Sequence, residues 1–538
     1  MPATLDEPQI DPCGTSAPGA EGPTGRRVAV VGAGPGGLAA AAMLAASGAS
    51  VSVLERRHQI GGRTGQLDLD GFRFDRGPTF FLMPYVLDEI FAACGERLAD
   101  HVELTRLDPM YRLVVGQEGS APVTIDATQD IDEMTRRIGR VSEADAANFR
   151  AFIADNRAKL DAAEPILRRP IRSLLDLVRP DAMRAGAHIK PHLTVHGLLS
   201  QYFKHPAVQL AVSFQSKYLG MSPYDCPSLF TILPYIEYAY GVWHPKGGCH
   251  QLMHALSGLV TKHGGEIRTG ADVTKLTFSG NSVKGVEVNG AEERFDHVVL
   301  NADAAHAMRT MIPERLRPNA WSDAAIDNKR YSCSTVMLYV GVDGAVDLPH
   351  HTIYTSKKYL QNLEDIGRDK GRGGTLSEDP SFYVCNPSRI DPTMAPAGKS
   401  ALYVLMPCPN TRADIDWDAQ KPALREIILD QMEQRLSLDI RPRIQRETML
   451  TPADWQADGI QFGATFNLAH NLGQMLHKRV PNELPGARGV WFVGGGTHPG
   501  SGLPVIFLSS QITAKMLAGK LGLGDPTLPV RSRAAVNT

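Results

Sequence analysis

The first strong pattern in the chain is a run of apolar, mostly β-branched residues at Val28–Val31, which ends at a glycine-rich turn. An alanine-rich segment follows the turn, and a second apolar run spans Ser50–Leu54. Short apolar runs between turn residues are typical of buried strands, and a longer alanine-rich segment is typical of a helix. The pattern therefore predicts a strand, a helix and a second strand in succession.

The turn between the first strand and the helix has the spacing G-x-G-x-x-G. Gly32 permits the tight turn, Gly34 lets backbone approach a pyrophosphate, and Gly37 lets the helix pack closely on the strand. The helix N-terminus offers unpaired N–H groups and a positive dipole end to phosphates. We predict that the dinucleotide-binding turn consists of Gly32, Ala33, Gly34, Pro35, Gly36 and Gly37.

An acid follows the second strand. Glu55 lies 18 residues after Gly37, where a carboxylate accepts both hydroxyls of an adenosine ribose. The acid argues against a ribose 2′-phosphate, although the basic residues Arg56 and Arg57 come directly after it. We include Arg56 with Glu55 among the predicted cofactor contacts. Six residues after the acid come Gly61, Gly62 and Arg63. They indicate either a second phosphate-binding turn or an exposed turn.

Two later stretches continue the same alternation of strands and helices. We predict the following elements in them: a helix at Gln251–Lys262, a strand at Asp272–Leu276, a hairpin at Val283–Val288, a strand at Val298–Leu300, a strand at Val490–Val493 and a helix at Ser509–Leu521. Elements of this kind, separated by long insertions, indicate one discontinuous, Rossmann-like α/β domain. Strand-like runs at Ser334–Val342 and Ala401–Met406 indicate a second, mixed α+β domain.

These patterns predict a division of the chain into segments: a disordered N-terminal tail at 1–25; a discontinuous nucleotide-binding domain at 26–103, 241–305 and 485–524; a substrate domain at 104–139 and 306–484; a helical insertion at 140–240; and a C-terminal tail at 525–538. The insertion holds four apolar residues at i, i+3, i+4 and i+7, namely Ile171, Leu174, Leu175 and Val178. Such a stripe, flanked by basic residues, either packs on its own domain or lies in a bilayer interface.

The composition argues against several classes of protein for this chain: nucleic-acid-binding, disulfide-rich, secreted and membrane-spanning proteins. The net charge of −2 gives no general attraction to nucleic acid, and the seven cysteines show no C-x-x-C spacing. Residues 1–25 lack the basic and apolar regions of a secretory signal, and no apolar run approaches the length of a spanning helix. We therefore expect a cytoplasmic protein whose contact with a membrane, if any, is peripheral.

Metal binding is not indicated by the histidines. His192 and His196, like His250 and His254, have i, i+4 spacing, but neither pair forms H-E-x-x-H or has an adjacent third ligand. No metal site is predicted.

The second strong motif is the run from Val490 to Pro504, in which a strand ends in a glycine cluster and another glycine-rich turn opens the last helix. Backbone with few side chains can approach a flat ring, and a helix N-terminus stabilises negative charge there. We expect this run to contribute Gly494, Gly495, Gly502, Leu503 and Pro504 to the cofactor site, with Thr497 and His498 near the reactive ring. His498 either relays a proton or shapes the loop.

Several motifs together resemble bacterial and fungal carotenoid desaturases of the phytoene type, over nearly the whole chain. The resemblance rests on the final glycine motif and on four further matches: Phe74–Thr79, Tyr240–Gly248, Leu300–Asp303 and Asp391–Gly398. The segment His477–Asn482 departs from that family's F-R-P-x-N run, and Val505–Leu508 is bulkier than in several relatives.

The resemblance implies FAD as cofactor, with further contacts from Gly77, Pro78, Thr79 and Val273, and with Thr497 and His498 as catalytic candidates. It implies that a long, acyclic isoprenoid is desaturated at the cytoplasmic membrane surface, with oxygen or a quinone as electron acceptor. A carotenoid cis–trans isomerase, a terminal-methyl carotenoid oxidase, an amine oxidase and a non-catalytic prenyl-binding protein are the alternatives. Substrate length (C30 or C40) stays open, as does a homo-oligomeric state.

Overall fold

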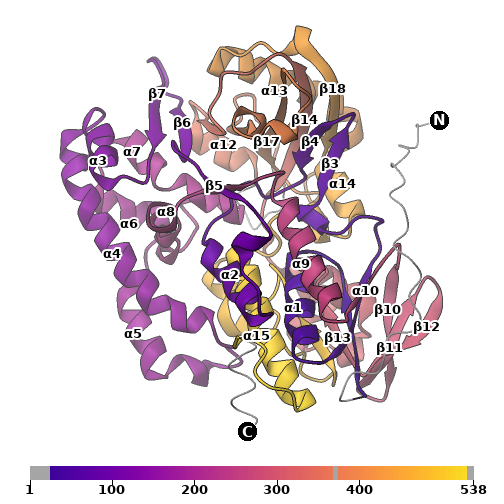
Figure 1. Cartoon of the computed structure of the whole chain (residues 1–538). Coiled ribbons are helices and arrows are strands. Elements are labelled where there is room, and N and C mark those ends of the chain that lie inside the picture. The colour runs from indigo at the N-terminus through magenta and orange to yellow at the C-terminus, as the bar shows by residue number, and fades with distance from the viewer. Residues whose placement is uncertain (1–24, 368–372, 530–538) are drawn as a thin grey trace.

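The computed structural model describes residues 25–367 and 373–529. Most of the predicted N-terminal tail and the last residues of the C-terminal tail lie outside this range. Figure 1 shows three regions: a sheet covered by α1, α9 and α15, a second sheet beside α13, and a lobe of helices α3–α8. Among the described residues, no helix is both long enough and apolar enough to cross a bilayer.

The first sheet has five parallel strands in the order β19-β13-β1-β2-β9. Its strands are β1 (Arg27–Val31), β2 (Ser50–Glu55), β9 (Glu266–Thr269), β13 (His297–Leu300) and β19 (Val490–Phe492). Strands from three distant stretches of the chain thus pair side by side. This pairing brings the loops that follow their carboxyl ends together along one edge.

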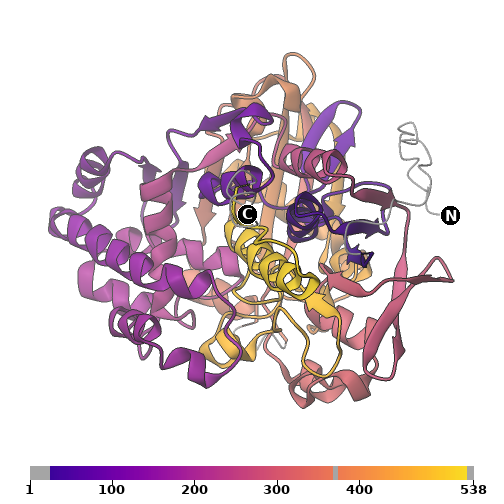
Figure 2. The ribbon, with the colours of Figure 1, turned by 60° about the horizontal axis from the view of Figure 1, so that its bottom comes forward.

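Alternate residues of β1 face opposite layers, as the period of a strand requires. Val28 and Val30 pack against the helices α1 (Pro35–Ala46), α9 (His250–Lys262) and α15 (Leu503–Leu521). Small alanine side chains let α1 pack directly on both other helices. Figure 2 shows α15 in yellow crossing this face of the molecule.

The other face of this sheet is covered by a three-stranded antiparallel sheet and by α10 (Ala304–Met311). The small sheet consists of β10 (Val273–Ser279), β11 (Ser282–Val288) and β12 (Ala291–Arg294). The predicted hairpin at Val283–Val288 is instead one strand, β11, which pairs with both neighbours. The turn follows it at Asn289-Gly290, where both residues have positive φ (49° and 83°), as a hairpin turn of this composition requires.

The second sheet has seven strands in the order β18-β14-β17-β16-β15-β6-β7. Its strands are β6 (Tyr111–Val115), β7 (Val123–Ala127), β14 (Ser334–Asp343), β15 (His351–Thr355), β16 (Phe382–Cys385), β17 (Lys399–Cys408) and β18 (Ile444–Leu450). One face packs against α13 (Trp417–Leu436), and the other contacts the hairpin of β3 (Gln66–Leu69) and β4 (Phe72–Asp75).

The helical lobe packs against β6 and β7 around a core that includes Phe149 and Phe152. Its helices are α3 (Ile131–Gly139), α4 (Glu143–Leu167), α5 (Pro180–His188), α6 (Val195–Tyr202), α7 (Pro206–Ala211) and α8 (Ile232–Tyr240). The prediction of a mainly helical segment here is confirmed.

The prediction of one helical stripe through Ile171, Leu174, Leu175 and Val178 is wrong. The chain forms only a 3-10 turn, Leu174–Leu177, and Ile171 is buried while the other three are exposed. Proline removes a helical donor at position 170, and Asp176 accepts the main-chain N–H groups of Arg172 and Ser173, which closes a short capping box.

The last helix begins six residues earlier than predicted. Helix α15 starts at Leu503 rather than Ser509, with Gly502 as its N-cap and Pro504 in its first turn. Proline is well tolerated in a first turn, because the N–H it lacks has no intrahelical partner there. Phe507, a weaker helix former, is fully buried there, and its packing outweighs its helix propensity.

Candidate functional site

One large cavity lies at the junction of the regions. It has a volume of about 720 Å³ and is lined by the loops after β1, β2, β13 and β19. Most of the predicted cofactor residues line it: Gly32, Gly34, Pro35, Glu55, Arg56, Gly62, Arg63, Gly77, Pro78, Thr79, Val273, Gly494, Gly495, Gly502, Leu503 and Pro504. Ala33, Gly36, Gly37 and Gly61 belong to the same turns but do not line the cavity.

The first glycine turn is built for close approach of backbone. Gly32 has a φ of 98°, and a Cβ on Gly37 would lie 2.1 Å from the Gly32 carbonyl oxygen. Helix α1 begins at this turn with Gly34 as N-cap, no side-chain cap and no acid in its first turn. Its N-terminal N–H groups therefore face the cavity edge free for an anion.

Asn301, at the end of β13, holds this turn in place. Its Nδ2 donates to the Gly32 carbonyl oxygen at 3.1 Å, and its side chain fills the space beside Gly34 and Gly36. The sequence contains Asn301 within a family motif, but nothing in the spacing reveals its contact with a turn 269 residues away.

Glu55 is nearly fully buried at the end of β2. Its Oε2 accepts the main-chain N–H of Ala33 at 2.7 Å, and its Oε1 accepts that of Arg57 at 3.0 Å. Each carboxylate oxygen keeps a lone pair for a further donor, as a ribose diol requires. Arg57 itself pairs with Asp458, so its guanidinium is engaged across the cavity.

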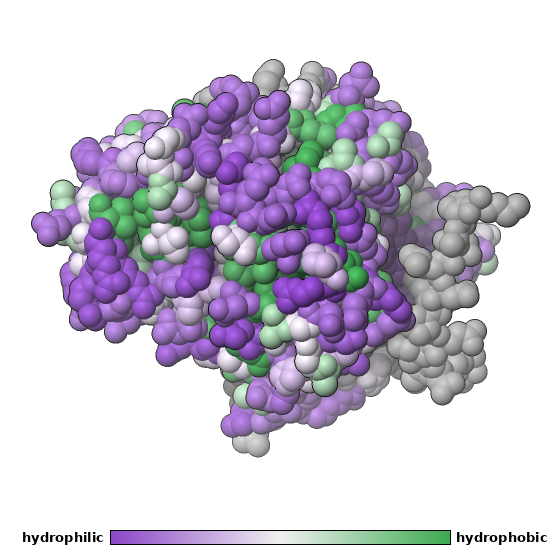
Figure 3. Space-filling model, turned by 90° about the horizontal axis from the view of Figure 1, so that it is seen from above, coloured by the Kyte–Doolittle hydropathy of each residue, from purple (hydrophilic) through white to green (hydrophobic). Residues whose placement is uncertain are grey.

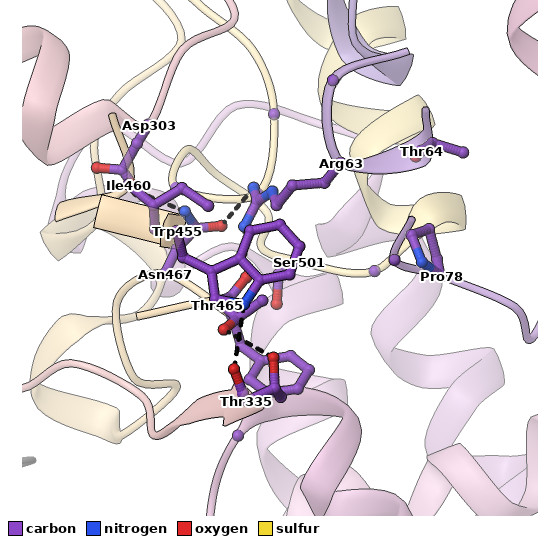
Figure 4. A pocket seen from close by; sticks show the side chains of 18 of the residues that line it. Arg63, Thr64, Pro78, Asp303, Thr335, Trp455, Ile460, Thr465, Asn467 and Ser501 are labelled. Carbon is purple, nitrogen blue, oxygen red and sulfur yellow. Dashed lines mark hydrogen bonds between the residues drawn. The ribbon is translucent and has the colours of Figure 1, made fainter. Parts of the chain in front are cut away.

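Arg63 brings a half-buried positive charge into the cavity (Figure 4). Its guanidinium donates to the Thr465 carbonyl oxygen and, at 3.0 Å, to Asn467 Oδ1. Asn467 in turn donates to Asp303, which caps α10 by accepting the His306 N–H at 3.0 Å. Burial lowers the pKa of Arg63, and the nearby Asp303 carboxylate opposes this shift.

Asp303 is thus the N-cap of α10, and the same carboxylate helps to orient the Arg63 site. Other polar groups lie around Arg63: Figure 4 shows Thr335, Thr465 and Ser501 lining the cavity near it, and of these only Ser501 belongs to a motif described above.

The second glycine cluster closes the cavity from another side. Gly494 follows β19 with a φ of 103°, and a Cβ on Gly496 would lie 2.7 Å from Ala304 Cβ. The N-terminus of α15 lines the cavity through Leu503 and Pro504, again without a side-chain cap or an acid in its first turn. Two helix N-termini thus face one cavity, which suits a long cofactor with negative charge near both ends.

The structure does not bring Thr497 and His498 to the cavity. Both side chains are buried, and neither lines it. His498 Nε2 bonds the Arg169 carbonyl oxygen at 2.9 Å, and burial lowers the pKa of His498 to about 4. This placement corrects their assignment as catalytic candidates, because a neutral imidazole that bonds backbone shapes the loop instead of reaching the reacting atoms.

Beyond Thr79 the cavity wall becomes aromatic and aliphatic. The apolar side of the wall includes Phe80, Leu82, Met83, Phe214, Tyr218, Leu233, Ile236, Ile353, Phe382, Tyr383, Tyr403 and Phe466. Most of these residues come from the second sheet and the helical lobe, and the others from the loop before α2 (Pro84–Ala93) and from the loop that holds Phe466. Their convergence therefore depends on the tertiary fold. Such a wall binds an apolar chain by removing its surface from water.

The two histidine pairs singled out by their spacing form no group of three metal ligands within the described part of the chain. His250 instead bonds the Thr64 carbonyl oxygen at 3.2 Å and packs edge-on against His254.

The cavity residues fit a flavin dinucleotide: glycine cradles without space for a Cβ, a half-buried arginine and an acid at the second strand. The family model described as flavin containing amine oxidoreductase matches residues 35–516. The chain belongs to this family. It is an FAD-dependent oxidoreductase, and FAD is its cofactor.

Proteins of known name resemble the chain over nearly its full length. A 4,4′-diapophytoene desaturase (4,4′-diapolycopene-forming) from a Methylomonas species is 41% identical over 498 residues, covering 92% of this chain and 96% of that protein. An all-trans-zeta-carotene desaturase from Myxococcus xanthus is 37% identical over 534 residues, covering 96% and 99%. Among solved structures, an oxidoreductase from Methanosarcina mazei has a TM-score of 0.59 at 18% identity, covering 90% and 98%. The structural likeness establishes the fold.

Proposed function

We propose that this protein is an FAD-dependent carotenoid desaturase that introduces conjugated double bonds into a long, acyclic isoprenoid. The observation that carries the proposal is the continuous cavity, which joins the dinucleotide-binding turn to an aromatic and aliphatic wall. An isoprenoid has no charged group to recognise, so apolar burial is the available means of binding it. The desaturase relatives, at up to 41% identity, support the same reaction.

FAD, when bound, supplies the hydride acceptor for oxidation of a saturated carbon–carbon bond. The chain supplies binding and orientation: the α1 N-terminus and Arg63 suit the diphosphate, and Glu55 suits the adenosine ribose. The wall beyond Thr79 holds the substrate chain and excludes water from it. The second product of each step is a proton from the adjacent carbon.

The first test is expression in cells that accumulate either phytoene or its C30 counterpart. We expect the extracted pigment to absorb at longer wavelength with at least one precursor, because each new conjugated bond lowers the transition energy. A flavin-free variant of the same protein is the control. Absence of any shift with both precursors, together with conversion of an already coloured acyclic carotenoid, would instead identify a terminal-methyl oxidase or an isomerase.

We also propose that the protein works at the cytoplasmic membrane surface, from which it draws its substrate. Supporting this, the segment around α5 exposes large apolar side chains at the edge of the molecule (Figure 1): Leu174 at 66%, Leu175 at 77%, Val178 at 65% and Met183 at 65%. The upper face in Figure 3 is mainly polar, with apolar patches between polar areas. A cluster of exposed aliphatic residues next to basic ones suits a bilayer interface.

Replacing Leu174 and Leu175 with aspartate should release the protein from liposomes while FAD stays bound. Both side chains are mostly exposed, so the change costs little folding free energy but places two charges where an apolar face would insert. Flotation with anionic liposomes measures this. The matched control replaces Leu360 and Leu472, which are 54% and 50% exposed elsewhere, with aspartate. Unchanged flotation of the first variant would contradict the assignment.

A further inference from the structure

A buried carboxyl group lies behind the apolar wall of the cavity. Glu237, on α8, is fully buried, whereas its helix neighbours Leu233 and Ile236 line the cavity. Nothing in the sequence marks this acid as part of a site, because it lies within a mainly apolar helix.

The two oxygens of Glu237 accept hydrogen bonds from three side chains. The hydroxyl of Tyr218 donates to Oε1 at 2.9 Å. Gln215 Nε2 and the hydroxyl of Tyr111 donate to Oε2 at 2.8 Å and 3.2 Å. These donors come from β6 and from the 3-10 helix Phe214–Leu219, so three elements converge on one carboxylate.

All three donors are neutral, and the cations nearby are directed elsewhere. Lys159, on the packed helix α4, donates to Thr231 Oγ1 at 2.8 Å. Lys217 Nζ, next to Tyr218 in the chain, lies 4.9 Å from the centre of the Tyr359 ring. A buried carboxylate without a paired cation is costly, and such groups gather at functional sites.

The protonation equilibrium of Glu237 reflects this environment. Burial raises its pKa to about 7, although the hydrogen bonds from Gln215, Tyr218 and Tyr111 oppose the shift. Both protonation states are therefore populated at neutral pH, which suits a group that takes up a proton and then releases it.

Tyr218 connects the carboxylate to the cavity. It lines the cavity, whereas Gln215 and Tyr111 do not. Its ring centre lies 5.2 Å from that of Phe80, which follows Thr79, so Tyr218 lies where the cofactor part of the cavity meets the apolar wall. Its O–H is donated to Glu237, which leaves the lone pairs of Oη to accept a proton.

We propose that Tyr218 and Glu237 together take up the proton that the substrate loses in each desaturation step. Tyr218 is the catalytic residue that faces the substrate, and Glu237 acts through it as the final acceptor. The inference rests on the proposed desaturase function and names the proton acceptor of the same cavity.

The step balances in protons and electrons. The hydride leaves the substrate with its C–H electron pair for FAD. The adjacent C–H bond breaks, its electron pair completes the double bond, and its proton binds Tyr218 Oη while the tyrosine O–H proton moves to Glu237 Oε1. Tyr218 stays neutral, and the carboxylate becomes a carboxylic acid. When oxygen or a quinone reoxidises the cofactor, it takes up one further proton, which the same two groups return in the reverse order.

The histidines behind a second tyrosine of the cavity offer no such route. The hydroxyl of Tyr383 lies 2.6 Å from His351 Nδ1, and the same nitrogen lies 3.3 Å from His350 Nδ1. His351 Nε2 has no hydrogen-bond partner among the described residues. A proton that reached His351 from Tyr383 could not be passed on, whereas the route through Tyr218 ends at a carboxylate.

The kinetic test uses Tyr218→Phe and the isosteric Glu237→Gln. Flavin absorbance first establishes FAD occupancy, and anaerobic stopped-flow with substrate in detergent or liposomes then follows flavin reduction in H₂O and D₂O. We expect wild type to show a solvent isotope effect and a rate that falls as pH drops below about 7, where Glu237 is protonated. Both variants should reduce flavin more slowly, on the order of 10²-fold, and lose the isotope effect and this pH dependence.

Two tyrosines provide matched controls. Tyr111 bonds the same carboxylate but does not line the cavity, so Tyr111→Phe should keep the isotope effect and move the pH profile upward, because it loses a bond that lowers the pKa of Glu237. Tyr383 lines the cavity but does not bond Glu237, so Tyr383→Phe should keep both the isotope effect and the wild-type pH profile. An unchanged rate in Tyr218→Phe, or equal losses in Tyr218→Phe and Tyr111→Phe, would overturn the proposal.

The second readout needs no turnover. Infrared spectra of the holoenzyme without substrate, recorded across the neutral pH range, should show a carboxylic-acid C=O band that disappears as pH rises and is absent from Glu237→Gln. A Glu237 that stays ionised, or stays protonated, over that range would overturn its role as acceptor. If wild type desaturates no precursor, the proposed function fails, and the infrared titration still decides whether Glu237 exchanges a proton near neutral pH.

Discussion

Replacing Gly37 with alanine should abolish FAD binding and destabilise the fold. The new Cβ would lie 2.1 Å from the Gly32 carbonyl oxygen and 2.9 Å from Asn301 Nδ2. The first contact is with backbone, so relief requires α1 to move away from the turn, which removes its N–H groups from the diphosphate position. Overpacking of this kind costs about 1–3 kcal/mol of folding free energy.

Flavin absorbance of the purified protein and thermal unfolding measure the two effects separately. Gly258→Ala is the matched control, since it lies within α9 and its Cβ would meet no heavy atom within 4 Å. That variant should keep its FAD and gain roughly 0.5–1 kcal/mol of stability from the better helix former. A Gly37→Ala protein with full FAD occupancy would show that the turn does not hold the cofactor.

Much of the first sheet and of the cofactor cavity can be predicted because its signals are local. The strand at Val28–Val31, the turn that follows and the acid at Glu55 lie within one continuous segment, where strand and helix periods and glycine spacing are directly visible. Burial of both β1 faces explains why Val28–Val31 reads as an unbroken apolar run instead of an alternating one.

The parts that could not be predicted depend on contacts between distant segments. Asn301 reaches the Gly32 turn only because β13 pairs with β1, and no periodicity encodes that register. His244 lies 3.1 Å from His350 and 2.9 Å from Asp391, yet these residues come from three separate segments, and nothing in the sequence indicates that they bond one another. Thr497 and His498 are predicted near the reactive ring because they belong to the glycine motif. A motif shows that residues lie near a site, but it does not determine which way their side chains point.

Replacing Arg63 with methionine should raise the Kd for FAD on the order of a hundredfold. The side chain lines the cavity with a half-buried guanidinium, whose partners there are a carbonyl oxygen and an amide oxygen. It therefore adds positive charge where the diphosphate is expected. A hydrogen bond to a charged group contributes about 1.5–3 kcal/mol, and 1.4 kcal/mol corresponds to about tenfold in Kd. Methionine keeps the volume of the chain and removes the charge.

Titration of deflavinated protein with FAD, followed by flavin fluorescence, measures this Kd. Arg73→Met is the matched control, because Arg73 is 47% exposed and its pair with Asp68 at 3.4 Å lies on the surface, where such pairs contribute little. Arg63→Lys should fall between wild type and Arg63→Met, since lysine restores the charge but not the planar fork that bonds two oxygens at once. Equal FAD affinity in all four proteins would show that Arg63 does not bind the diphosphate. The α1 N-terminus would then be its principal partner.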